Sequence, residues 1–204
     1  MRYFIFSACL LFSHFGLTQN QKNYILEING DTISLSLDKQ VVLKTKSGQT
    51  LNINLKQKEV LTFSDETFSF NYPSTFTLSS KNVEDGVEQI LGISANGNGL
   101  LLQKYKDFNP ENVVDLMMEE ITEESKDAGY KESSKNVSQL LKSGKTLNGK
   151  QSTLVLDDER NIYTIYPLKI RKGGILIVLM LIDPADENAK KVYDMLWKTL
   201  EIKN

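Results

Sequence analysis

A run of eight apolar residues near the C-terminus constrains the fold of this chain most strongly. It extends from Ile175 to Ile182, between Gly174 and Asp183. A segment of this length without a polar position predicts a strand that is covered on both faces, at the centre of a sheet. Pro167 lies in the strand expected just before it and predicts an interruption, a bulge or an edge there, because proline cannot donate a ladder hydrogen bond.

Two other segments have helical periodicity. The first runs from Pro110 to about Ala128, with Asn109 as a suitable N-cap and Gly129 as a suitable stop. The second begins at Pro184, after Asp183 as the expected cap, and continues to about residue 199. With the strands expected between these segments, the pattern predicts a mainly antiparallel α+β domain over residues 59–204.

Residues 24–58 form a separate pattern of short alternating strands. Asn29-Gly30 is a strong hairpin signal, and a second turn is expected near Gly48. Residues 22–58 contain six lysines but only three acidic residues, Glu27, Asp31 and Asp38. We interpret this stretch as a small β-meander module, which either covers the larger domain or binds a partner.

The first 18 residues, MRYFIFSACLLFSHFGLT, have the layout of a secretory signal. Arg2 precedes an interrupted apolar stretch, and Gly16 and Thr18 suit the positions before a cut near residues 18 and 19. The stretch is too short to span a membrane. Alternatives are an N-terminal core helix, a membrane anchor, or a lipoprotein acylated at Cys9. Cleavage predicts a secreted or periplasmic protein without a transmembrane span.

Composition excludes several kinds of chemistry once the leader is removed. The only cysteine is Cys9 and the only histidine is His14, so the mature chain would have neither. This excludes thiol nucleophiles, disulfides, catalytic triads with histidine, and zinc sites built from histidine or cysteine. The 24 basic and 26 acidic residues give a net charge of -2, or -3 after the loss of Arg2. No basic excess indicates a nucleic-acid partner.

The first predicted helix has a strongly acidic outer surface. Its candidate partner-binding residues are Glu119, Glu120, Glu123 and Glu124. The structural alternative is an ordinary solvated helix face, which needs no partner. The acidic face therefore predicts either solvent exposure or docking to a basic partner, and the lysine-rich module itself is one candidate for that partner.

The remaining acidic clusters give weak evidence for catalysis. Asp157, Asp158 and Glu159 are the best candidate ligands for a divalent cation, although a polar hairpin turn also explains them. Asp65, Asp85 and other scattered acids carry no spacing signal. The glycines of Asn96-Gly97-Asn98-Gly99 mark a turn and not a dinucleotide fingerprint. We predict no catalytic residue and no cofactor.

Residues 60–203 resemble the PsbP-like and DcrB-like domains. The aromatic segment Phe68-Ser69-Phe70-Asn71-Tyr72-Pro73-Ser74-Thr75-Phe76 is similar to their opening strand. The end of the chain also resembles theirs, with a hairpin, an apolar strand and a helix that leads into Leu200-Glu201-Ile202. The resemblance implies a central antiparallel sheet with helices on both sides. It also implies a mostly non-catalytic role, with no catalytic residue to transfer.

These observations favour an exported, non-enzymatic accessory or binding protein of the bacterial envelope, with an unidentified protein partner. One alternative is an envelope enzyme that uses carboxylates with a bound divalent cation, around Asp157, Asp158 and Glu159. Another is a protein that binds a lipid or a small apolar molecule between the sheet and the N-terminal module.

Overall fold

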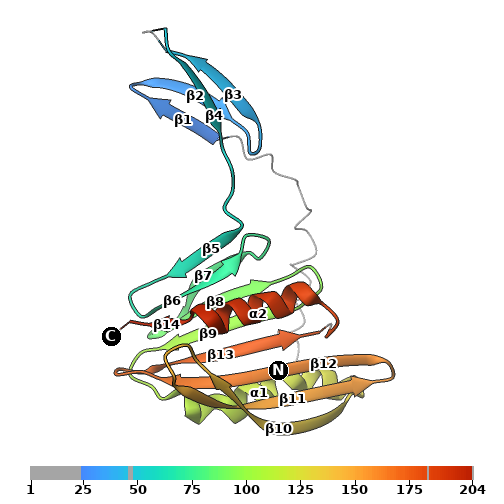
Figure 1. Ribbon diagram of the computed structural model, residues 1–204. Coiled ribbons are helices and arrows are strands. Elements are labelled where there is room, and N and C mark those ends of the chain that lie inside the picture. The colour runs from blue at the N-terminus through green and yellow to red at the C-terminus, as the bar shows by residue number, and fades with distance from the viewer. Residues whose placement is uncertain (1–23, 46–47, 183, 204) are drawn as a thin grey trace, which may run out of the picture. The chain divides into compact units, whose positions relative to one another are not determined.

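A computed structural model describes residues 24–45, 48–182 and 184–203 (Figure 1). The chain divides into two compact units, residues 1–57 and residues 58–204. The predicted signal peptide, residues 1–18, lies outside the described residues. Among the helices that the structure describes, none has both the length and the apolar character needed to cross a membrane.

The first unit contains two short hairpins. Their strands are β1 (Tyr24–Ile28), β2 (Asp31–Leu35), β3 (Gln40–Lys44) and β4 (Thr50–Asn54). Asn29 and Gly30 connect β1 to β2 with φ angles of 52° and 86°. Two consecutive positive φ angles are the requirement of a type I′ turn, so the predicted hairpin at Asn29-Gly30 is confirmed. An isolated parallel bridge joins Leu37 to Leu55.

The second unit is built around a seven-stranded sheet with the order β10-β11-β12-β13-β9-β8-β7 (Figure 1). All of its neighbouring pairs are antiparallel. Its strands are β7 (Leu78–Glu84), β8 (Val87–Ile93), β9 (Gly99–Tyr105), β10 (Lys131–Leu140), β11 (Thr146–Leu156), β12 (Glu159–Lys169) and β13 (Gly174–Leu181). The apolar strand β13 lies at the centre, and its first six residues are buried, which confirms the prediction made from its sequence.

One face of this sheet packs against helix α1 (Val114–Asp127). Leu176 and Val178 of β13 join Met118 of the helix in one hydrophobic cluster. A 3-10 turn, Pro110–Val113, precedes the helix, and the side chain of Asn109 accepts a hydrogen bond from the backbone of Glu111 at 3.2 Å. The predicted cap and start of this segment are therefore confirmed.

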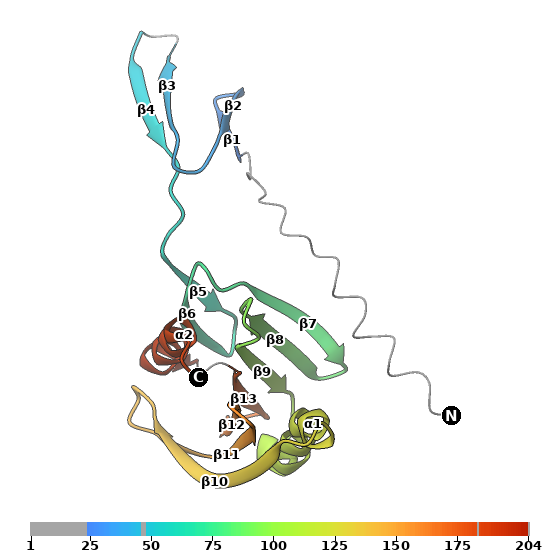
Figure 2. The same ribbon diagram turned by 90° about the vertical axis from the view of Figure 1, so that its right-hand side faces the viewer.

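The other face of the sheet packs against a second, three-stranded sheet and the helix beside it (Figure 2). This layer consists of β5 (Val60–Ser64), β6 (Phe68–Pro73), β14 (Glu201–Ile202) and α2 (Glu187–Thr199). Ile175 and Ile177 of β13 share a cluster with Phe68, Phe70 and Leu196. Alternate residues of β13 thus enter opposite clusters, as the pleat of a strand requires.

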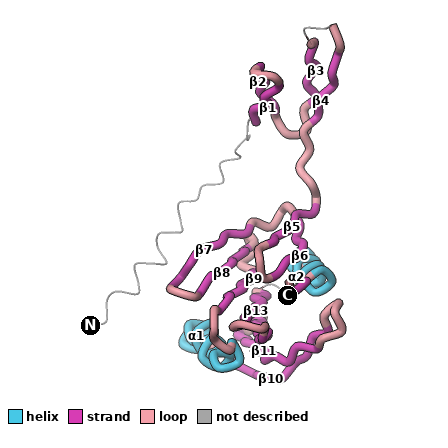
Figure 3. The backbone as a smooth tube through the Cα atoms, turned by 90° about the vertical axis from the view of Figure 1, so that its left-hand side faces the viewer, coloured by secondary structure: helices cyan, strands magenta, loops and turns pink. Residues whose placement is uncertain are grey.

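The predicted class, an α+β domain with helices on both sides of a central sheet, is wrong, because strands dominate and a second sheet shares with α2 the cover of the face opposite α1. The described chain is mostly β, with 54% of residues in strands and 18% in helices (Figure 3). The prediction assigned the covering of the sheet to helices. In the structure, aromatic residues of a second sheet, such as Phe68 and Phe70, supply much of that apolar cover.

The start of the last helix also differs from the prediction. Asp183 was expected to be the cap, but it lies outside the described residues, and α2 begins only at Glu187. Asp186 is the N-cap, and its carboxylate accepts hydrogen bonds from the backbone N–H groups of Asn188 and Ala189. Both Asp183 and Asp186 are suitable capping residues, so residue type alone did not distinguish them.

The two edges of the seven-stranded sheet are polar or irregular. The first six residues of β10, numbers 131–136, are exposed, and β7 has a register shift between Asn82 and Glu84. Inside the sheet, the pairing of β11 with β12 ends at Lys150 and Ile165. Pro167 lies two residues beyond that last pair and still pairs in regular register with Leu176 of β13, so the predicted interruption is found only on the β11 side of the strand.

Candidate functional site

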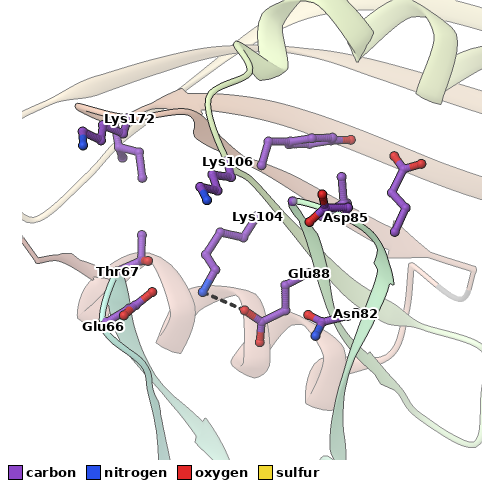
Figure 4. Close-up of a pocket in the computed structure, with 13 residues that line it drawn as sticks. Glu66, Thr67, Asn82, Asp85, Glu88, Lys104, Lys106 and Lys172 are labelled. Carbon is purple, nitrogen blue, oxygen red and sulfur yellow. Dashed lines mark ion pairs between the residues drawn. The ribbon is translucent and has the colours of Figure 1, made fainter.

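A charged pocket of about 550 Å³ lies in the second unit and is our candidate site (Figure 4). Four segments surround it: the β5–β6 turn, the β7–β8 hairpin, the end of β9 and the β12–β13 turn. The lining residues are Glu66, Thr67, Asn82, Glu84, Asp85, Gly86, Val87, Glu88, Lys104, Tyr105, Lys106, Ile170 and Lys172. Four acidic and three basic side chains make this pocket mixed in charge.

Lys104 occupies the centre of an ion-pair network at this pocket. Its Nζ atom lies 2.7 Å from a carboxylate oxygen of Glu88 and 2.8 Å from one of Asp65. The three side chains are only 19%, 27% and 18% exposed, respectively. One ammonium group therefore pairs with two partly buried carboxylates, in a setting where charge pairs are screened less than at the open surface.

The fold brings these three residues together through strand register and turn geometry. Glu88 and Lys104 are directly paired residues of β8 and β9, so their opposite charges face each other across the sheet. Asp65 lies in the β5–β6 turn. Its other carboxylate oxygen accepts hydrogen bonds from the backbone N–H groups of Thr67, at 2.7 Å, and Phe68, at 2.8 Å. These bonds fix the carboxylate where Lys104 can reach it.

The ion-pair network moves the pKa of each of its three groups further from neutral pH. Burial raises the pKa of Asp65, but the hydrogen bond from Lys104 and those from the backbone of Phe68 and Thr67 outweigh it, so the pKa is lowered. The hydrogen bond from Lys104 lowers the pKa of Glu88. Burial lowers the pKa of Lys104, but its bonds to Asp65 and Glu88 together raise it above its usual value. All three groups are therefore fully ionised near neutral pH.

These charge states favour structure and binding over proton transfer. A general acid needs a carboxyl pKa that is raised toward the working pH, and a lysine nucleophile needs a lowered one. Asp65, Glu88 and Lys104 shift in the opposite directions. The pocket can present fixed charges and hydrogen-bonding groups to a partner, with Lys106 and Lys172 along the same wall (Figure 4).

The predicted partner-binding residues lie elsewhere. Glu119, Glu120, Glu123 and Glu124 are all exposed on α1, and none of them lines the charged pocket. Glu119 forms an ion pair with Lys126 at 2.6 Å, close to the end of the helix. The structure does not test whether this acidic face binds a partner, so its role remains a prediction.

The predicted metal ligands occupy the turn between β11 and β12. Asp157 has a φ of 51°, and Asp158 completes the turn before Glu159 opens β12. The hydroxyl of Tyr130 donates a hydrogen bond to Glu159. In the described part of the chain, no group of three or more acidic, histidine or cysteine side chains is placed to hold a metal ion. The assignment of these residues to a metal stays a prediction.

Sequence analysis missed the residues that form the charged pocket. Asp65 was treated as one of several scattered acids, and Lys104 was not singled out at all. One signal was present, because Lys104 is the one charged residue of the strand Gly99–Tyr105. The pairing of Glu88 with Lys104 follows only from the observed loop at residues 94–98, which sets Ile93 opposite Gly99.

Comparison with known proteins finds similarity at the level of structure. No protein-family model and no curated protein matches the chain. Among solved structures, it is similar to the solution structure of cyanobacterial PsbP (CyanoP) from Synechocystis sp. PCC 6803. The identity is 13% and the TM-score 0.46, over 71% of this chain and 92% of that one.

Proposed function

We propose that this chain is an exported, non-enzymatic accessory or binding protein of the bacterial envelope. The observation that carries the proposal is the ion-pair network of the charged pocket. Lys104 forms ion pairs with both Asp65 and Glu88 at 2.7–2.8 Å. Their shifted pKa values keep all three groups ionised, so none of them has the pKa that acid–base or nucleophilic catalysis requires.

The proposal of export rests on the sequence of residues 1–18. The partner that we propose is a protein. Removal of this leader takes away the only histidine and the only cysteine, which limits the chemistry of the mature chain. The acidic face of α1 is a second candidate contact, with Glu119, Glu120, Glu123 and Glu124 exposed to a partner of opposite charge.

The first test measures export. A C-terminally tagged full-length chain is expressed in a bacterium, its cells are fractionated, and the intact mass of the recovered protein is determined. We expect the envelope fraction to contain a chain that begins near Gln19. A variant with Leu10→Arg and Leu11→Arg, which disrupts the apolar stretch, should stay in the cytoplasm uncut. Recovery of the uncut wild-type chain from the cytoplasm would reject the export proposal.

The second test measures catalysis and partner recovery with the same mature protein. We expect no turnover of ester, phosphoester, glycoside or peptide substrates, with or without millimolar calcium or magnesium. Affinity capture from the native envelope followed by native mass spectrometry should yield a stoichiometric protein complex. Cation-dependent turnover that disappears in the triple variant Asp157→Ala, Asp158→Ala, Glu159→Ala would replace the proposal with the metal-enzyme alternative.

A further inference from the structure

A second hollow in the same unit has a strongly one-sided charge. This basic groove has a volume of about 1310 Å³ and contains six basic residues against Glu66 and Glu201. Its lining is Glu66, Thr67, Leu141, Lys142, Ser143, Lys145, Leu168, Lys169, Ile170, Arg171, Lys172, Leu200, Glu201, Ile202 and Lys203. A local charge of +4 contrasts with the net charge of -2 of the whole chain. Anions are therefore drawn to this side of the unit.

Four segments that are distant in sequence build the groove. These are the β5–β6 turn, the β10–β11 turn, the β12–β13 turn and the C-terminal segment with strand β14. The β12–β13 turn lies beside β14 at one end of the unit (Figure 1). The groove is thus formed by turns and a strand edge, which leaves it accessible along its length.

Among the described residues, Lys142 is the one basic residue of the groove that has a carboxylate within 4.0 Å. Among the described residues, no carboxylate lies within 4.0 Å of Lys169, Arg171 or Lys172, and all three are exposed. Lys142 is paired with Glu201 at 3.2 Å, but both side chains are 63% exposed. Such an exposed pair contributes little and can open to accept another carboxylate.

The floor of the groove is apolar, and one side is a strand edge. Leu141, Leu168 and Leu200 are buried beneath the basic side chains. Strand β14 is the last strand of its three-stranded sheet and pairs only with β6, through Glu201 and Ile202. Edge strands can accept a further strand, and an apolar floor favours alternate apolar side chains on that strand.

We propose that the basic groove binds an acidic, extended segment of a protein partner. The proposal rests on the proposed binding function and specifies the chemistry of the partner. Carboxylates of the segment would meet Lys169, Arg171 and Lys172, where the planar guanidinium of Arg171 can hold a carboxylate in a bidentate manner. Apolar side chains of the segment would contact Ile170 and Ile202, which line the groove and are only partly buried. Its backbone would align along β14.

The composition of the groove favours this occupant over other polyanions. Its lining residues include no aromatic side chain, so the bases of a nucleic acid have no stacking surface there. The unpaired cations extend along one strand end and turn, residues 169–172, next to the edge of β14. A linear series of carboxylates matches this arrangement better than one compact anion does. An anionic membrane surface is the competing outcome that the experiment must separate.

The test uses the mature chain and a fluorescein-labelled ten-residue peptide of alternating glutamate and valine. Binding is followed by fluorescence anisotropy at low salt and again at about 0.5 M salt. We expect salt-sensitive binding that the double variant Lys169→Glu, Arg171→Glu weakens at least about tenfold. The matched control is Lys131→Glu, Lys135→Glu, the same charge change on the exposed edge strand β10, which should leave the affinity unchanged. A peptide N-methylated at alternate residues should bind more weakly than the parent.

Specific outcomes would overturn the inference. Equal loss of affinity in the two double variants would mean that only net charge matters. Binding to vesicles of phosphatidylcholine with phosphatidylglycerol, without binding of the peptide, would assign the groove to a membrane surface. If the double variant Lys169→Glu, Arg171→Glu still captures the envelope partner normally, the inference about the groove fails while the proposed binding function stands. Turnover of a substrate would reject the proposed function and leave the peptide result intact.

Discussion

Lys104 and Asp65 are separated by 39 positions in sequence, yet the ammonium nitrogen of Lys104 lies 2.8 Å from the Asp65 carboxylate. The same ammonium is paired with Glu88, directly opposite on the neighbouring strand. One cation therefore links the three-stranded sheet, through the β5–β6 turn, to the seven-stranded sheet. Loss of this cation would leave two partly buried carboxylates close to each other.

Substitution of Lys104 by methionine should therefore destabilise the protein. We expect a decrease of about 1–2 kcal/mol in the free energy of unfolding, between the values of exposed and buried pairs. Urea unfolding monitored by circular dichroism measures the change. Lys106→Met is the matched control, because Lys106 is exposed on the same wall and forms no ion pair among the described residues. Equal effects of the two substitutions would show that the network contributes nothing specific.

The same network predicts how stability depends on pH. The pKa values of Asp65 and Glu88 are lower in the folded chain than in the unfolded one. Their stabilising contribution is thus complete above the unfolded pKa values of about 4 and is lost as the pH falls through the folded values. Wild type should lose more stability than Lys104→Met between about pH 6 and pH 3. Parallel pH profiles for the two proteins would contradict the assignment.

Gly173 should be intolerant of any side chain. Its φ is 91°, and a methyl group there would overlap the carbonyl oxygen of Tyr105. Gly173→Ala should cost at least about 2 kcal/mol, from backbone strain and the overlap together. Gly129→Ala separates the two effects, because Gly129 has a similar φ of 96° but open space around it. Chemical unfolding of both variants should give the larger loss for Gly173.

Tyr193 connects α2 to the end of the seven-stranded sheet. Its hydroxyl lies 2.6 Å from the carbonyl oxygen of Met180 and 3.0 Å from that of Gly99, and burial raises its pKa. Tyr193→Phe should lower the free energy of unfolding by about 1 kcal/mol. Tyr72→Phe should have almost no effect, because the Tyr72 hydroxyl has no hydrogen bond within the described chain. Thermal unfolding compares the two, and similar shifts would show that the hydroxyl of Tyr193 is unimportant.

The acidic face of α1 offers a separate test of partner binding. Reversal of Glu119, Glu120, Glu123 and Glu124 to lysine should reduce the recovery of a basic partner in an affinity capture. The four side chains are exposed, so the fold should tolerate the change. Circular dichroism verifies that it does. Unchanged recovery by a correctly folded variant would remove this face as a contact.

Features encoded by neighbouring residues could be predicted from the sequence. Asn109 caps its segment as expected, the hairpin turn at Asn29-Gly30 has the required positive φ angles, and the apolar strand β13 is central. Each depends on a short range of chain, where residue type and spacing directly limit the backbone. The N-cap of α2 was misplaced because two aspartates, three residues apart, satisfy the same local requirement.

Features that depend on long-range packing could not be predicted. The fold class failed because periodicity does not show which element covers a buried strand, and Phe68 and Phe70 supply cover where a helix was expected. Asp65 carries no local signal of its contact with Lys104, since that contact exists only after the two sheets pack. Glu88 is the intermediate case, because the observed loop of one hairpin sets the register that places it opposite Lys104.

The polar and irregular edges of the seven-stranded sheet affect how easily many copies of the protein can join into a fibre. Fibres grow when identical chains add backbone to backbone along an open edge. On β10, an incoming chain would have to crowd against Lys131, Glu132 and Lys135, and on β7 it would meet the break near Asn82. The charged residues of β10 and the register shift of β7 therefore disfavour the addition of further chains to the main sheet.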